Sequence, residues 1–408
     1  MSDLSLQRLH GQLAALDAAS DSYATQFVDV LTAAGRQLGA SDMHLVPASG
    51  GVEVRIRIDG VLQSIGTFPP GMKADIITRL KVMADLLTYR TDVPQEGRIL
   101  DRQAGTEMRV STLPTLHGEK AVVRLFATEG CYRFLGDLGL PPEVSRRLLA
   151  LLGETSGAIL IVGPAGSGKT TTAYACLREM LRTSAAGRSI ATLEDPIEVA
   201  LPGVAQTQVN QRAGLDLAAG LRALLRQDPE VILVGEMRDP ITAGIALQAS
   251  LTGQLVLTTF HAGSAAAAVG RLADMGLEPY VLRSGILAVV CQRLVRRLCV
   301  CAEDAAGGEA LLGLPVARAR VARSCPECHG TGYRGRALIA EMFTVDSDDV
   351  ATAILSRADT AVIRQAAIRS GMQTCWHYAC QAVEAGLTSP QEVRRVLGFV
   401  DALSDGRG

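Results

Sequence analysis

The chain has 408 residues and a formal net charge of −2, so it is long enough for two or three domains and lacks the basic balance of bulk nucleic-acid binding. No window reaches the roughly 18–20 uncharged apolar residues of a membrane span, and the N-terminus lacks the basic and apolar segments of a secretory signal. Nine cysteines in such a chain indicate reduced thiols or a metal site, and we expect a cytosolic protein that reaches membranes only through partners.

The first part of the chain is predicted to form a mixed α/β domain over residues 23–130, after a short amphipathic helix within 1–22. A helix at 23–39 precedes "VEVRIRIDGVLQSIG", in which apolar and polar residues alternate as in strands, with Asp59-Gly60 as a hairpin turn. A second helix is expected at 72–87, followed by strands around "MRVSTLPT" and "KAVVRLF".

Residues 127–142 are expected to link this domain to a second one over 131–290, with Pro141 and Pro142 opening a new helix. From about 143 to 290 apolar strands alternate with helices, which predicts a largely parallel sheet covered on both faces. A Cys-containing segment at 291–345 and a helical part at 346–408 follow. The basic cluster "RLVRRL" at 293–298 is predicted to be the solvated face of a helix.

The stretch "ILIVGPAGSGKTTT" (159–172) has the full G-x-x-x-x-G-K-T pattern of a phosphate-binding loop between a strand and a helix. Glycines let backbone N–H groups close around phosphate oxygens, while Lys169 reaches the β- and γ-phosphates and the Thr170 hydroxyl is placed for Mg²⁺. The alternative, a chance Gly-rich turn, is disfavoured because strand, motif and helix occur in order. The predicted nucleotide-binding residues are Gly163, Pro164, Ala165, Gly166, Ser167, Gly168, Lys169, Thr170 and Thr171.

Three later strands are predicted to deliver polar groups to the same sheet edge. "IATLEDPIE" ends in Glu194, Asp195 and Glu198, and "VILVGEMRD" ends in Glu236, preceded by Gly235 where Asp is usual. Either Glu194 or Glu236 could polarise the attacking water, and Glu236 could instead hold Mg²⁺ through water. "LVLTTFHAG" adds Thr258, Thr259 and His261, whose imidazole is a candidate γ-phosphate sensor; the alternative is a structural histidine.

The run "LRALLRQDPEVILVGEMRDPITAGIALQASLTGQLVLTTFHAG" closely resembles the secretion ATPases that assemble type IV pili and type II secretion pseudopili. "SDMHLVPASGGVEVRIRIDGVL", "PQEGRI", "GYRGRALIAEMF" and "GMQTCWHYACQAVEAGLTSPQEVRRVLG" extend the resemblance to about residues 23–400. It implies an N-terminal α/β domain, a RecA-like P-loop ATPase domain, ATP with Mg²⁺, a homo-hexamer and an inner-membrane platform partner. Glu194 matches the family's Asp box, Glu236 its Walker B motif and His261 its His box.

The resemblance also places arginines of the N-terminal domain opposite the triphosphate. Arg98 in "PQEGRI" and Arg109 in "MRVS" are the candidates, with Arg124 a weaker one. A guanidinium there would neutralise charge on the transferred phosphoryl group. The alternative is surface strand arginines paired with Glu96 or Glu107.

Cys299, Cys301, Cys325 and Cys328 form two close pairs, and four thiolates are the usual cage of structural Zn²⁺. "CPEC" has the common C-x₂-C spacing, whereas "LCVC" is C-x-C, so Cys291 or His329 could replace a ligand. The alternative is four thiols without a metal.

The resulting hypothesis is an ATP-hydrolysing motor for pilus or pseudopilus assembly, peripheral to the bacterial inner membrane. Three alternatives stay open. The cysteine segment disfavours a retraction ATPase, and the near-neutral charge disfavours a DNA-transfer ATPase. The third alternative is a subunit that binds nucleotide without hydrolysing it, and the presence of Lys169, Thr170, Glu194 and Glu236 disfavours it.

Overall fold

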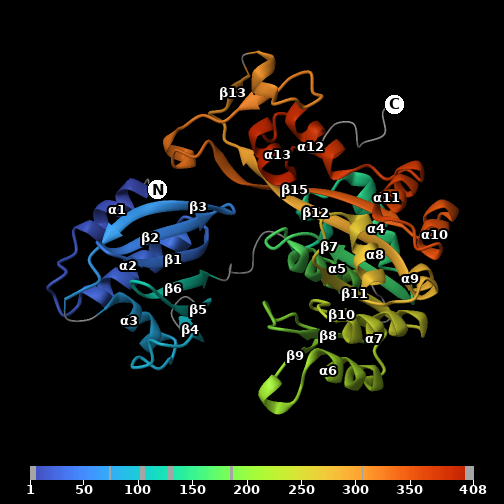
Figure 1. Ribbon diagram of the computed structural model, residues 1–408, viewed down its shortest axis with the longest axis horizontal. Helices are drawn as coiled ribbons and strands as arrows, with labels where there is room; N and C mark the ends of the chain where they lie inside the picture. The colour runs from blue at the N-terminus through green and yellow to red at the C-terminus, as the bar shows by residue number, and fades with distance from the viewer. Residues whose placement is uncertain are drawn as a thin grey trace. The chain divides into compact units, whose positions relative to one another are not determined.

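The computed structural model describes residues 6–72, 75–101, 106–125, 133–183, 187–305 and 307–399 (Figure 1). It contains two compact units, one built mainly from residues 1–130 and the other mainly from the residues after them. The start of the predicted N-terminal helix, the first part of the predicted linker at 127–142 and the end of the predicted C-terminal part lie outside the described ranges.

The first unit contains a six-stranded sheet with the strand order β3-β2-β1-β6-β5-β4, and each neighbouring pair in it is antiparallel. Its strands are β1 (Ala40–Ala48), β2 (Gly51–Ile58), β3 (Val61–Phe68), β4 (Gln95–Asp101), β5 (Thr106–Thr115) and β6 (Gly118–Leu125). Its helices are α1 (Leu6–Ala14), α2 (Tyr23–Gln37) and α3 (Ile76–Met83).

The predicted alternation in β2 is present, because Val54 and Ile56 are fully buried in the core of this unit. Asp59 and Gly60 form the predicted turn, both with positive φ (48° and 81°), as a two-residue hairpin of the primed type requires. Helix α1 buries Leu9 and Leu13 against the same core, which attaches the N-terminal helix to this unit. α3 is shorter than predicted and begins after Asp75, whose carboxylate caps the helix by accepting from Thr78 N at 3.0 Å.

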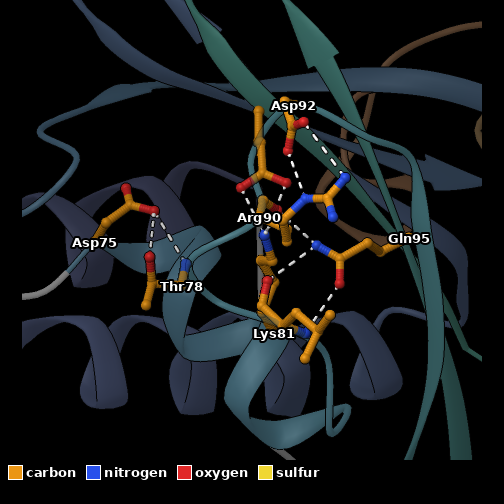
Figure 2. A network of polar contacts seen from close by, with 8 residues as sticks. Asp75, Thr78, Lys81, Arg90, Asp92 and Gln95 are labelled. Atoms are coloured by element: carbon orange, nitrogen blue, oxygen red, sulfur yellow. Dashed lines mark hydrogen bonds and ion pairs between the residues drawn. The ribbon is translucent and has the colours of Figure 1, made fainter.

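A buried ion pair fixes the chain between α3 and β4 (Figure 2). The Lys81 ammonium donates to both oxygens of Glu119 at 2.9 Å and to the carbonyl oxygen of Arg90 at 2.7 Å. Gln95 closes the same loop by donating to the Arg90 and Leu87 carbonyls and accepting from Leu87 N. The start of β4, the strand that carries Arg98, is therefore held by polar contacts.

The second unit contains a seven-stranded sheet with the order β15-β12-β7-β11-β10-β8-β9, in which the pairs from β12 to β9 are parallel. Its strands are β7 (Gly157–Val162), β8 (Ile190–Glu194), β9 (Ala205–Gln208), β10 (Val231–Val234), β11 (Leu255–Phe260), β12 (Ile286–Leu298) and β15 (Tyr333–Thr344). The short strands β13 (Glu303–Asp304) and β14 (Arg320–Val321) form a separate pair. The helices are α4 (Pro142–Leu151), α5 (Lys169–Thr183), α6 (Leu217–Leu224), α7 (Pro240–Leu251), α8 (Ala265–Asp274), α9 (Pro279–Gly285), α10 (Asp348–Leu355), α11 (Thr360–Arg369), α12 (Cys375–Glu384) and α13 (Pro390–Leu397).

Helices cover both faces of this sheet, as the continuous apolar strands predicted. On β7, Leu160 and Val162 join a core formed with α6 to α11, whereas Ile159 and Ile161 join a core formed with α4 and α5. The predicted α/β class is thus confirmed, and so is the helical C-terminal part.

The prediction of a helix face at 293–298 is wrong, because these residues belong to strand β12. β12 pairs with β7 in parallel over Ile286 to Cys291 and then continues to Leu298. Val289, Val290 and Val295 of β12 favour a strand, and β12 lies between β15 and β7 in the sheet, which a sequence window does not reveal. The strand–helix alternation consequently extends beyond residue 290.

Candidate functional site: a phosphate-binding loop at a carboxylate-lined sheet edge

The phosphate-binding motif forms the turn between β7 and α5. All six residues of β7 are buried, and the loop then needs positive φ at Gly163, Gly166 and Gly168 (151°, 73° and 87°). A side chain at Gly163 would bring its Cβ to 2.6 Å from the carbonyl oxygen of Gln292, so only glycine fits there. Helix α5 starts at Lys169, so the free N–H groups of the helix N-terminus face the loop, as anion binding requires.

Lys169 is folded across this loop. Its ammonium donates to the carbonyl oxygens of Gly163 at 3.0 Å and Pro164 at 2.9 Å. Burial lowers the pKa of Lys169, the negative charge of Glu236 opposes that shift, and the positive charge of Arg293 adds to it. The Lys169 amine is therefore within the electrostatic reach of both Glu236 and Arg293.

Glu236 and His261 meet at the edge where β10 and β11 end. The two strands run in parallel, with Val234 opposite Thr258, so the residues that follow them emerge together. His261 Nε2 lies 2.7 Å from Glu236 Oε1, and Arg238 donates to Glu236 Oε2 at 2.6 Å. The Glu236 carboxylate thus has one partner on each oxygen.

Glu194, at the end of β8, has a different environment. It is 2% exposed, and its carboxylate accepts from Thr192 Oγ1 at 2.7 Å, from Gln206 Nε2 at 3.2 Å and from the Tyr174 hydroxyl. Burial and the bond to Glu194 raise the pKa of Tyr174, which keeps that hydroxyl protonated as a donor. Tyr174 belongs to α5, so this contact ties the helix behind the phosphate-binding loop to β8. Sequence reasoning missed it.

The three candidate arginines of the first unit lie in one row across its sheet. Arg98 on β4 is opposite Arg109 on β5, which is opposite Arg124 on β6. Arg98 pairs with Glu107 at 3.1 Å and Arg109 with Glu96 at 3.1 Å. These are the two glutamates of the alternative in which the arginines form surface ion pairs. Arg124 pairs with Asp42 at 3.0 Å.

The four predicted cysteines form one cluster: the sulfur atoms of Cys299, Cys301, Cys325 and Cys328 all lie within 4.8 Å of one another. Cys325 caps the start of a 3₁₀ turn (Pro326–Cys328) that ends at Cys328, and the two sulfurs are 3.6 Å apart. Zn–S bonds of about 2.3 Å in a tetrahedron place sulfurs about 3.8 Å apart, so this spacing fits a metal cage. Cys328 Sγ also lies within hydrogen-bonding distance of the backbone N–H groups of Cys325 at 3.3 Å and Gly332 at 3.2 Å, and of the Cys325 carbonyl oxygen at 3.3 Å.

Two further residues at the phosphate-binding loop were missed from the sequence. Gln292, fully buried on β12, donates to the Ser167 carbonyl oxygen at 2.7 Å, and Arg293 donates to the carbonyl oxygen of Gly263, which follows His261. The signal that identifies them is the register of β12 beside β7, which the predicted helix at 293–298 does not contain. Among the parts of the chain that the structure describes, no helix has the length and apolarity to span a membrane.

Comparison with known proteins gives one consistent result. The chain is 42% identical to type II secretion system protein HxcR of Pseudomonas aeruginosa over 370 residues, which cover 90% of this chain and 76% of that protein. It is also 42% identical to type II secretion system protein E of Klebsiella pneumoniae over 388 residues (93% and 77%). Type IV pilus assembly ATPase PilB of Thermus thermophilus is 40% identical over 384 residues (91% and 43%).

Solved structures show the same fold. The pilus retraction motor PilT with bound ADP superposes with a TM-score of 0.62 at 24% identity, covering 91% of this chain and 97% of that one. The ATPase DotB of Legionella pneumophila gives 0.67 at 22% identity (90% and 94%). The family model described as "Type II/IV secretion system protein" matches residues 17–395, and the chain therefore belongs to the family of type II/IV secretion ATPases.

Proposed function

We propose that this protein is an ATPase whose hydrolysis of ATP powers the assembly of a type IV pilus or a type II secretion pseudopilus. The observation that carries the proposal is a complete phosphate-binding loop inside a family match spanning residues 17–395, with relatives of about 40% identity named for these two systems. In this proposal Lys169 binds the β- and γ-phosphates, and the hydroxyl of Thr170 ligates the Mg²⁺ that accompanies ATP.

Glu236 and His261 are proposed to act on the γ-phosphate end of the nucleotide. Glu236 would orient and deprotonate the attacking water, and His261, 2.7 Å from it, would sense the γ-phosphate. Arg98 and Arg109 would supply positive charge to the transferred phosphoryl group, each giving up its present glutamate partner. The row that they form with Arg124 supports this assignment, because neighbouring guanidiniums provide a surface for a polyanion.

The cysteine cluster is proposed to hold one structural Zn²⁺. Four sulfurs with the observed spacing fit that ion, and thiolates are ligands that zinc prefers. The ion would stabilise the local chain fold and take no part in the reaction. We further propose that the protein works as a homo-hexamer at the cytoplasmic side of the inner membrane and transmits its motion to a membrane platform protein.

The direct test is ATP turnover by the purified full-length protein, followed as phosphate release. We expect Mg²⁺-dependent hydrolysis in the wild type and near-complete loss in Lys169→Ala, because the loop then has no charge for the β- and γ-phosphates. Lys120→Ala, a change outside the loop, is the matched control and should keep wild-type turnover. A wild type that binds ATP without hydrolysing it in the presence of Mg²⁺ and its membrane platform would refute the motor and favour the non-hydrolysing alternative.

A further inference from the structure

Gln292 lies beside the phosphate-binding loop because of strand register. β12 pairs with β7 so that Cys291 is opposite Val162, and the next residues of the two strands are Gln292 and Gly163. The Gln292 backbone oxygen would be 2.6 Å from a Cβ at Gly163, and its Nε2 would be 3.3 Å from a Cβ at Gly168. One residue therefore borders both the first and the last glycine of the loop.

The side chain of Gln292 also bonds the loop directly. Its Nε2 donates to the carbonyl oxygen of Ser167 at 2.7 Å, and the whole residue is inaccessible to solvent. In a planar trans peptide the C=O and the following N–H point in opposite directions. Anchoring the Ser167 carbonyl to β12 thus turns the N–H of Gly168 away from β12 and fixes the direction of one donor of the loop.

Two buried polar atoms at this contact have no hydrogen-bonding partner within the described residues: Gln292 Oε1 and Ser167 Oγ. A buried, unsatisfied polar atom destabilises a fold, so a fold keeps such a group where something else requires it. A purely structural contact would be served as well by an apolar side chain of similar size. The unpaired amide oxygen indicates that the amide is needed for its N–H donors.

We propose that Gln292 is a positioning residue of the phosphate-binding loop, which holds the Ser167–Gly168 peptide in the orientation that binds nucleotide phosphates. The inference rests on the proposed ATPase function and deepens it. Arg293, the next residue, bonds the carbonyl oxygen of Gly263. The same segment of β12 therefore contacts both the phosphate-binding loop and the loop after His261.

The test compares nucleotide affinity with turnover in Gln292→Met, which keeps the length of the side chain and removes its donors. Affinities are measured with fluorescent derivatives of ADP and of a non-hydrolysable ATP analogue, and turnover as phosphate release. Losing one hydrogen bond predicts about five- to tenfold weaker binding of both nucleotides, since both contain the phosphates held by the loop. kcat at saturating ATP should stay within about twofold, because the interaction is the same in ground and transition states. Gln248→Met, an exposed glutamine on α7, is the matched control.

Gln292→Glu separates positioning from packing. A buried carboxyl has a raised pKa; below that pKa its O–H can donate to the Ser167 carbonyl, and above it the carboxylate repels that oxygen. The affinity of this variant relative to wild type at the same pH should therefore improve as pH falls from about 8.5 to about 6. Gln292→Met should show no such recovery.

Unchanged nucleotide affinity in both variants, even with a lowered melting temperature, would overturn the inference and leave the ATPase function standing. A fall in kcat without a change in affinity would overturn it as well, because Gln292 would then act on the chemical step. A wild type that neither binds nor hydrolyses ATP would instead refute the proposed function together with the inference.

Discussion

Replacing Lys81 by Met is expected to destabilise the first unit by several kilocalories per mole. The side chains of Lys81 and Glu119 are 0% and 9% exposed, and all three ammonium protons have acceptors in Glu119 and the Arg90 carbonyl (Figure 2). Removing the lysine leaves a carboxylate with little access to water, and the Arg90 carbonyl oxygen loses one of its two donors, keeping only the bond from Gln95. Breaking a buried pair in this way costs about 3–5 kcal/mol.

The assay is hydrogen exchange of peptides from α3, β4 and β6 followed by mass spectrometry. The single tryptophan, Trp376, belongs to α12 in the second unit, so its fluorescence does not report on this site. A loss of 3 kcal/mol or more should speed exchange of the slowest amides in these elements by about 10²-fold or more, since 1.4 kcal/mol is a factor of ten.

Two comparisons make the prediction specific. Lys81→Met combined with Glu119→Gln removes both charges and should recover much of the loss, because the cost comes from the unpaired charge. Asp92→Asn breaks the Arg90–Asp92 pair, whose side chains are 46% and 68% exposed, and should cost less than about 1 kcal/mol. Exchange in Lys81→Met within about threefold of wild type, or no recovery in the double variant, would refute the reasoning.

Three predictions concern the site. Glu236→Gln should bind ATP but hydrolyse it about 10²-fold more slowly, as measured by phosphate release; a normal rate would move the water-orienting role to Glu194. Arg98→Ala and Arg109→Ala should each lower turnover by about tenfold or more with ADP affinity largely kept, and wild-type turnover in both would reject the proposed role. Elemental analysis should find about one Zn²⁺ per chain and none in Cys325→Ser/Cys328→Ser, whereas a metal-free, folded and active wild type would exclude the site.

Features that depend on short stretches of sequence were predictable. The phosphate-binding loop is one such feature, because strand, glycines and Lys169 are consecutive, and its φ values follow from its glycines. The proximity of Glu236 and His261 was predictable indirectly, from the sheet. Both residues follow buried parallel strands, and such strands end at the same sheet edge. The cysteine cluster followed from two close pairs, although the C-x-C spacing did not specify how Cys299 and Cys301 would turn.

Features that depend on strand register or on distant side chains were not predictable. Gln292 lies 125 residues from Ser167 in the chain, and nothing near it indicates which loop it borders. The same limit hid the Tyr174–Glu194 contact, since it joins a helix to a strand through two side chains. The misassigned helix at 293–298 had the same origin: basic residues suggested solvent exposure, whereas pairing of β12 within the sheet determined its conformation.

The sequence offered both Glu194 and Glu236 as the carboxylate that polarises the attacking water, and their environments in the structure differ. Glu194 is enclosed, and its oxygens accept from three neutral donors, which occupy three of the roughly four acceptor positions of a carboxylate, while burial restricts the access of water. Glu236 has an 18% exposed side chain and is bonded to His261 and Arg238, which are 44% and 64% exposed. Exposed partners can rotate away at little cost, and Glu236 is the carboxylate whose charge acts on Lys169. Polarising a water therefore requires less rearrangement at Glu236, while Glu194 is suited to holding α5 and β8 in place beside it.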